Sequence, residues 1–155
     1  MEPTTADRRR SAEDHPLSSR WRTTARWLLG PAYVVAGILH LAVPEPFLQI
    51  MPDIVPAPKL VILATGVAEI AGGLALLQNF FPPIRKAAAW GLAIYAVCVF
   101  PANINHFAMD MARVDHGLGL AYHIPRMLLQ PLLVWLVLWA GQIILWPQRL
   151  PDKHD

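Results

Sequence analysis

The chain has little charge and almost no cysteine. Only 15% of its 155 residues are charged, whereas 55% are hydrophobic. An average soluble protein carries about 25% charged residues, so this shortage argues against an ordinary soluble domain and indicates lipid as the surrounding solvent. The one cysteine, Cys98, cannot form an internal disulfide or a paired-thiol redox motif.

Four segments are apolar and long enough to approach a membrane-spanning helix, which needs about 20 residues. A soluble helical bundle would have polar outer faces, and the fourth segment has almost none. We therefore predict an all-α membrane protein, an antiparallel bundle of four transmembrane helices within residues 26–147. The segments are Trp27–Val43, Leu60–Leu77, Ala87–Asn103 and Met127–Trp146.

The distribution of basic residues predicts the orientation of the bundle. Arg and Lys side chains gather before the first segment, between the second and third, and after the fourth. Because positive residues favour the cytoplasmic side, both termini are expected in the cytoplasm, with a disordered tail over residues 1–25 and a short tail over residues 148–155. Acidic residues interrupt the N-terminal arginines, so a nucleic-acid partner is not expected. The expected location is a bacterial inner membrane.

The two outer connections differ in character. The stretch "PEPFLQIMPDIVPAPK" is too apolar for a free loop and too rich in proline for a span. It is predicted to lie at the outer interface as a short helix with irregular flanks. The segment Ile104–Arg126 is expected to form the longest outer loop. His106 and Asp110 in that segment have helical i,i+4 spacing, but no zinc signature is matched and no metal site is predicted.

One carboxylate lies in the middle of the second segment, "LVILATGVAEIAGGLALL". A charge at that depth costs several kcal/mol unless it is paired, hydrated or protonated. The glycines around Glu69 permit close helix contact, so the side chain is predicted to face the bundle interior. Arg126 is one candidate partner, and a protonated Glu69 bonded to His40 or Asn103 is the alternative.

Polar residues from four different helices fall in the outer half of the predicted bundle. Each has a structural explanation, such as a histidine satisfied within the protein, an amide bonded to backbone near a proline, or an arginine reaching the headgroups. Together they form either a buried structural network or a ligand-binding site. The set is His40, Glu69, Asn103, Arg126 and Gln130.

The order of several short motifs resembles the DoxX-like family of small four-helix membrane proteins. The motifs are "GILHL", "TGVAEIAGGLALL", "AAAWGL", "VFPANI" and "QPLLVW", and the resemblance runs from about Gly37 to Trp139. Two departures are Leu41, where the family usually has an aromatic residue, and "RMLLQ", in which the family's proline has moved. The resemblance implies that the family's polar positions correspond to the five polar residues named above: His40, Glu69, Asn103, Arg126 and Gln130.

The resemblance implies two classes of function and leaves enzymatic activity open. Some DoxX-like proteins are linked to quinol oxidation or quinone-dependent sulfur oxidation, and others resemble assembly factors for membrane partners. No haem, flavin or iron–sulfur ligand set is visible in this sequence. An accessory role beside a larger membrane protein or redox complex is therefore favoured. The alternative is a redox-associated protein that binds a quinone or a similar small lipophilic ligand. The oligomeric state stays open, a homo-oligomer included.

Overall fold

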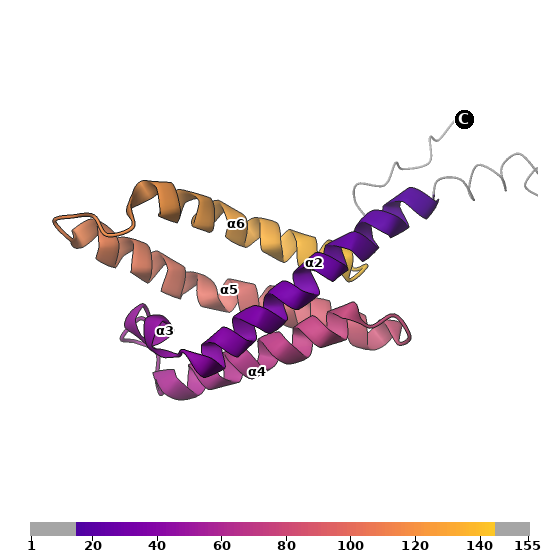
Figure 1. Ribbon diagram of the computed structural model, residues 1–155, viewed down its shortest axis with the longest axis horizontal. Coiled ribbons are helices and arrows are strands. Elements are labelled where there is room, and N and C mark those ends of the chain that lie inside the picture. Colours follow the sequence, from indigo (N-terminus) through magenta and orange to yellow (C-terminus); the bar gives the residue numbers. More distant parts are fainter. Residues whose placement is uncertain (1–14, 145–155) are drawn as a thin grey trace, which may run out of the picture.

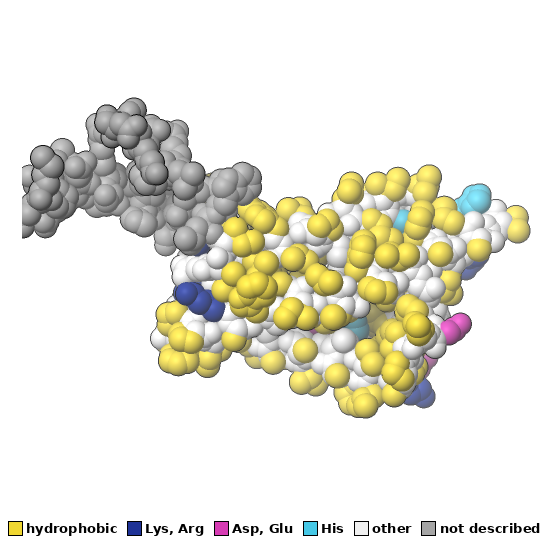
Figure 2. All heavy atoms as spheres, turned by 180° about the vertical axis from the view of Figure 1, so that it is seen from behind, with side chains coloured by type: hydrophobic (Ala, Val, Ile, Leu, Met, Phe, Trp, Pro, Cys, Tyr) yellow, Lys and Arg dark blue, Asp and Glu magenta, His cyan; other side chains and the backbone are white. Residues whose placement is uncertain are grey.

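The computed structural model describes residues 15–144, with side chains from residue 20 onward, and these residues are helical apart from short connections (Figure 1). Four helices are long and apolar enough to cross a membrane. Hydrophobic side chains cover most of the face seen in Figure 2. These features support a multi-pass membrane protein. The helices are α2 (His15–Ala42), α3 (Glu45–Gln49), α4 (Pro58–Leu77), α5 (Pro82–Ala112) and α6 (Gly119–Ala140).

The helix boundaries correct two of the predictions. Residues 15–25 belong to α2 and are not a disordered tail, while residues 1–14 and the C-terminal tail lie outside the described residues. The long outer loop is also wrong, because α5 continues to Ala112 and α6 begins at Gly119. The acidic and histidine residues of this stretch gave the sequence a loop-like character, although α5 and α6 also contain prolines. Membrane helices tolerate such prolines when neighbouring groups satisfy the freed backbone.

Close backbone contact between α2 and α4 rests on glycine. A Cβ atom added to Gly37 would lie 2.5 Å from the carbonyl oxygen of Gly66, and one added to Gly73 would lie 2.6 Å from that of Gly30. Two glycine pairs, seven residues apart on each helix, therefore remove the side chains that would hold the helices apart. This is the small-residue packing expected between membrane helices.

The remaining contacts close the bundle, since α4 packs on α5, α5 on α6, and α6 on α2. Figure 1 shows α3 and the α5–α6 turn at one end of the molecule and the α4–α5 turn at the other. The apolar core lies toward the α4–α5 turn and includes Leu76, Ala89, Leu92 and Val137. The cavities and the polar residues predicted from the sequence lie toward the end of the bundle that contains α3.

Candidate functional site

Glu69 is 3% exposed and faces the interior of the bundle, which confirms that prediction. Its Oε2 atom lies 2.7 Å from Nδ1 of His40 on α2. The same nitrogen lies 2.9 Å from the carbonyl oxygen of Ala36. Because a carbonyl cannot donate, Nδ1 carries the hydrogen and donates it to Ala36, and Oε2 makes no aligned hydrogen bond of its own. The contact between His40 and Glu69 is therefore electrostatic.

The short helix α3 covers this pair. The ring of Phe47 stacks on the His40 imidazole, with ring centroids 3.8 Å apart. Since α3 also packs on α4, it closes the outer side of the His40–Glu69 contact. An aromatic ring above an imidazole excludes water from one face of the ring and strengthens electrostatic contacts beneath it.

A cavity of about 330 Å³ opens beside Glu69, between α2, α4, α5 and α6. Its walls are mostly apolar, and its polar lining residues are Tyr33, Glu69, Tyr95, Asn103, Arg126 and Gln130. Tyr95 interacts with the Glu69 carboxylate. The Tyr33 hydroxyl is buried and has no hydrogen-bond partner within the described part of the chain. An apolar chamber with a few converging polar groups is the usual form of a small-molecule site.

A second cavity, of about 420 Å³, lies under α3. His40, Phe47 and Met51 line it, together with residues of α4 and α5. The two cavities share four lining residues: Tyr95, Val99, Asn103 and Arg126. These four side chains form a wall common to both cavities, which we call the junction, and the His40–Glu69 pair contributes one residue to each cavity.

Asn103 and Gln130 form a second polar pair, which joins α5 to α6. The Asn103 amide donates to Oε1 of Gln130 over 3.0 Å. The Gln130 amide in turn donates to the carbonyl oxygen of Ala96. Both ends of the Gln130 amide are thus engaged, so this residue holds α6 against α5, with one amide hydrogen left over beside the cavity that it lines.

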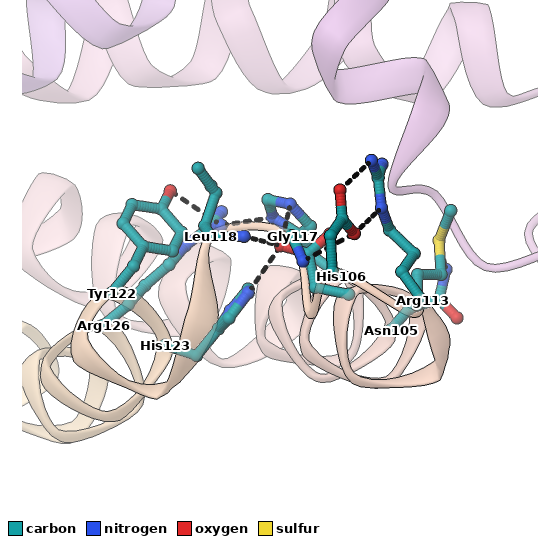
Figure 3. Close-up of polar contacts among 11 residues, drawn as sticks. Asn105, His106, Arg113, Gly117, Leu118, Tyr122, His123 and Arg126 are labelled. Carbon is teal, nitrogen blue, oxygen red and sulfur yellow. Dashed lines mark hydrogen bonds and ion pairs between the residues drawn. The ribbon is translucent and has the colours of Figure 1, made fainter.

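Arg126 lies across the cavity from Glu69 but bonds to other residues. Its Nη1 atom donates to Nδ1 of His106 over 2.8 Å and to the Tyr122 hydroxyl over 3.2 Å, as Figure 3 shows. The ion pairs recorded within residues 20–144 do not join Arg126 to Glu69. The expected Arg126–Glu69 pair is therefore not formed, and His40 is the predicted partner that lies against Glu69.

A carboxylate fixes the C-terminal end of α5 to the N-terminal end of α6. Oδ2 of Asp110 accepts hydrogen bonds from Nε2 of His123 and from the Leu118 backbone N–H, each over 2.9 Å (Figure 3). His106 Nε2 lies 3.6 Å from the same oxygen. The cluster connects the α5–α6 turn to Arg126, and Arg126 lines both cavities. The sequence showed the i,i+4 spacing within this segment, but not that His123 would fold back onto it.

The ligating atoms of His106, Asp110 and His123 lie within 4.8 Å of one another and could hold a metal ion. The hydrogen bonds of His106 restrict metal binding at this cluster. Because Arg126 always donates, Nδ1 of His106 must accept, and Nε2 of a neutral His106 therefore carries a hydrogen toward Asp110. A metal could bind that nitrogen only after the hydrogen leaves. The cluster is therefore self-consistent as a hydrogen-bonded network.

Of the five residues predicted from the sequence, four form two pairs, His40 with Glu69 and Asn103 with Gln130. The fifth, Arg126, lines both cavities. Sequence reasoning missed the lining tyrosines Tyr33 and Tyr95. Each lies in an apolar stretch where an aromatic residue resembles ordinary core, so no signal marked it.

The sequence matches a family described as a domain of unknown function, DUF8561, over residues 29–144. The match covers most of the chain and includes all the residues of the candidate site. No curated protein and no solved structure matches the chain.

Proposed function

This chain belongs to the DUF8561 family, and we propose that it binds a small lipophilic molecule with a polar, carbonyl-bearing head, such as a quinone. The ligand would occupy the two joined cavities, its head at the junction and its apolar part along the helix walls. The protein would serve as an accessory subunit, because electrons for any redox step must come from a membrane partner.

The observation that carries this proposal is the Tyr33 hydroxyl. It is buried, it lines the same cavity as Glu69, and it has no hydrogen-bond partner. Leaving a buried polar group unpaired costs about 1–3 kcal/mol. A ligand with a polar head would satisfy the hydroxyl, and the apolar walls of a cavity of about 330 Å³ would favour the rest of the molecule.

The charged groups at the junction suit a carbonyl-bearing head. Arg126 lines both cavities and always carries donors, so it is the natural donor to a ligand oxygen. His40 and Glu69 lie 2.7 Å apart, each on the wall of one cavity, and could exchange a proton with a ligand there. Gln130 would position α6.

The proposed setting is an antiparallel bundle in a bacterial inner membrane, with both termini cytoplasmic and α3 at the outer interface. The basic residues near the α4–α5 turn, Arg85 and Lys86, and the apolar side chains of α3 support it. The resemblance to DoxX-like proteins supports a quinone as the ligand class, and that family assignment stays a prediction.

Mass spectrometry of lipophilic molecules that co-purify with the detergent-solubilised protein tests the proposal. The Val99→Trp variant fills the junction of the two cavities and should abolish ligand retention. Val97→Trp makes the same change on a side chain that is 61% exposed, and should retain the ligand. Equal retention by both variants would refute binding at the junction.

A second variant separates ligand binding from stability. Tyr33→Phe removes only a hydroxyl that has no partner in the free protein, so the thermal unfolding midpoint should not fall. Ligand retention should fall. If the wild-type protein carries no lipophilic molecule and instead forms a stable complex with a larger membrane protein, the polar cluster is structural and the accessory role needs no ligand.

A further inference from the structure

Two arginines are buried at the end of the bundle opposite α3. Arg26 on α2 is 7% exposed and Arg85 near the start of α5 is 6% exposed. Figure 2 shows Lys and Arg side chains at this end of the molecule. Arginine is almost never buried to this extent unless an opposite charge or a set of hydrogen bonds compensates it.

Neither guanidinium group has an anionic partner among residues 20–144. Nη2 of Arg26 donates to the Thr23 hydroxyl, and Nη2 of Arg85 donates to the Gln142 side chain, each over 2.9 Å. Both acceptors are neutral. Three further nitrogens are buried and make no hydrogen bond in the described structure: Nε and Nη1 of Arg26 and Nε of Arg85.

The two arginines are also close enough to repel each other electrostatically. The described ion pairs of the chain all lie around Glu69 or in the α5–α6 region, so they do not relieve this repulsion. Arg22, one helical turn before Arg26, frames the same region, with its guanidinium 5.4 Å from the Trp139 ring centroid. The site therefore combines two buried positive charges with unused donors.

We propose that Arg26 and Arg85 together bind a phosphate group at this end of the bundle. A guanidinium presents its donors in a planar fork that matches phosphate oxygens, and one anion between the two arginines would remove their repulsion. The phosphate belongs to the headgroup of an anionic phospholipid or to free inorganic phosphate. Basic pockets between transmembrane helices on the cytoplasmic side commonly hold anionic headgroups.

Thermal unfolding of the full-length protein in a neutral detergent tests this site. Phosphatidylglycerol should raise the unfolding midpoint in a saturable way, whereas phosphatidylcholine should not. Arg26→Gln and Arg85→Gln should each weaken the apparent affinity about tenfold, or about 1.4 kcal/mol. Lys86→Gln is the matched control, because it removes a charge from the neighbouring exposed residue and should leave the affinity unchanged.

Inorganic phosphate distinguishes the two sources of the anion. If phosphate alone stabilises the protein and competes with the lipid, the site accepts free phosphate. If phosphate has no effect and phosphatidylglycerol does, the site is specific for a lipid headgroup. The proposal is overturned if neither anion stabilises the wild-type protein, or if the arginine variants respond as Lys86→Gln does.

Native mass spectrometry of the wild-type protein provides a test that needs no variant. Phosphatidylglycerol should remain bound at collision energies that remove phosphatidylcholine, or phosphate adducts should persist. Loss of both lipids at the same energy, without phosphate adducts, would overturn the proposal even if the arginine variants failed to fold.

Discussion

Nδ1 of His40 lies 2.7 Å from Oε2 of Glu69 and thereby joins α2 to α4 in the middle of a predominantly apolar bundle. Gly37 and Gly66 each precede one member of this pair by three residues. Their backbones are so close that a Cβ on Gly37 would lie 2.5 Å from the Gly66 carbonyl oxygen. The glycine contact therefore brings the helices near enough for a short acidic side chain to reach the imidazole.

We expect this pair to be energetically coupled. Glu69→Leu and His40→Leu should each lower the free energy of unfolding by about 3–5 kcal/mol, because removing one partner leaves the other polar group buried without compensation. The double variant should lose clearly less than the sum of the two. Reversible unfolding in mixed micelles measures all three, and strictly additive losses would contradict the pairing.

Arg126→Met provides a further control. Arg126 bonds to His106 and Tyr122 and not to Glu69. Adding Arg126→Met should therefore not restore the stability that Glu69→Leu loses. Glu69→Gln should be milder than Glu69→Leu, since the amide retains hydrogen-bonding capacity at the cavity wall.

The glycine contact yields a second prediction. Gly37→Ala places a methyl group against the Gly66 backbone, which cannot rotate away, and should destabilise the bundle by about 1–3 kcal/mol. Gly91→Ala is the same substitution on α5 with no atom within 4 Å, so it should be neutral or slightly stabilising. Unfolding midpoints of the two variants measure the difference, and equal midpoints would argue against close α2–α4 packing.

Hydropathy was sufficient to predict the four apolar helices, because lipid demands long uninterrupted apolar segments. The interior position of Glu69 followed from the cost of exposing a carboxylate to hydrocarbon. The partner of Glu69 did not follow, since that depends on which side chains the helix rotations bring together. Similarly, the segment containing His106 and Asp110 was predicted as a solvated loop, because polar residues at the end of a long helix have the same composition as a loop.

The cover formed by α3 can be tested by cysteine labelling in a Cys98→Ser background, which removes the native free thiol. A cysteine at Phe47 or Ile50 should react slowly with a water-soluble thiol reagent, since both native side chains are partly buried and line the cavity. A cysteine at Asp53, which is exposed, should react quickly. Equal rapid labelling at all three positions would show that this segment is a free loop.

Orientation in the membrane is open to a direct measurement. A reporter fused after Lys153 should show cytoplasmic activity, because the basic residues within 8–26 and around the α4–α5 turn favour that side. A matched fusion after Asp53 should report the opposite side. Periplasmic activity from the Lys153 fusion would reverse the orientation and place the joined cavities in the inner half of the membrane.

The turn between α5 and α6 gives a pH-dependent prediction outside the spans. The Arg113 guanidinium donates to both carboxylate oxygens of Asp115, over 2.9 and 3.1 Å, and the Gly117 N–H donates to one of them over 3.2 Å. These bonds lower the pKa of Asp115 from 3.8 to about 2, and the bonding to Arg113 makes the largest contribution. Arg113→Gln should raise this pKa toward its ordinary value, as measured by NMR titration of the carboxyl carbon.

The sign of the effect on stability follows from the lowered pKa. The unfolded chain takes up the Asp115 proton at higher pH than the folded chain does, so the stabilising contribution is complete above about pH 4 and is lost as the pH falls through about 2. Arg113→Gln should therefore be less stable than wild type above about pH 4, and the difference should disappear as the pH falls through about 2. Val114→Ala, next to Asp115 but fully exposed, is the control and should leave the titration unchanged. An unaltered Asp115 pKa in Arg113→Gln would assign the lowering to the Gly117 N–H instead.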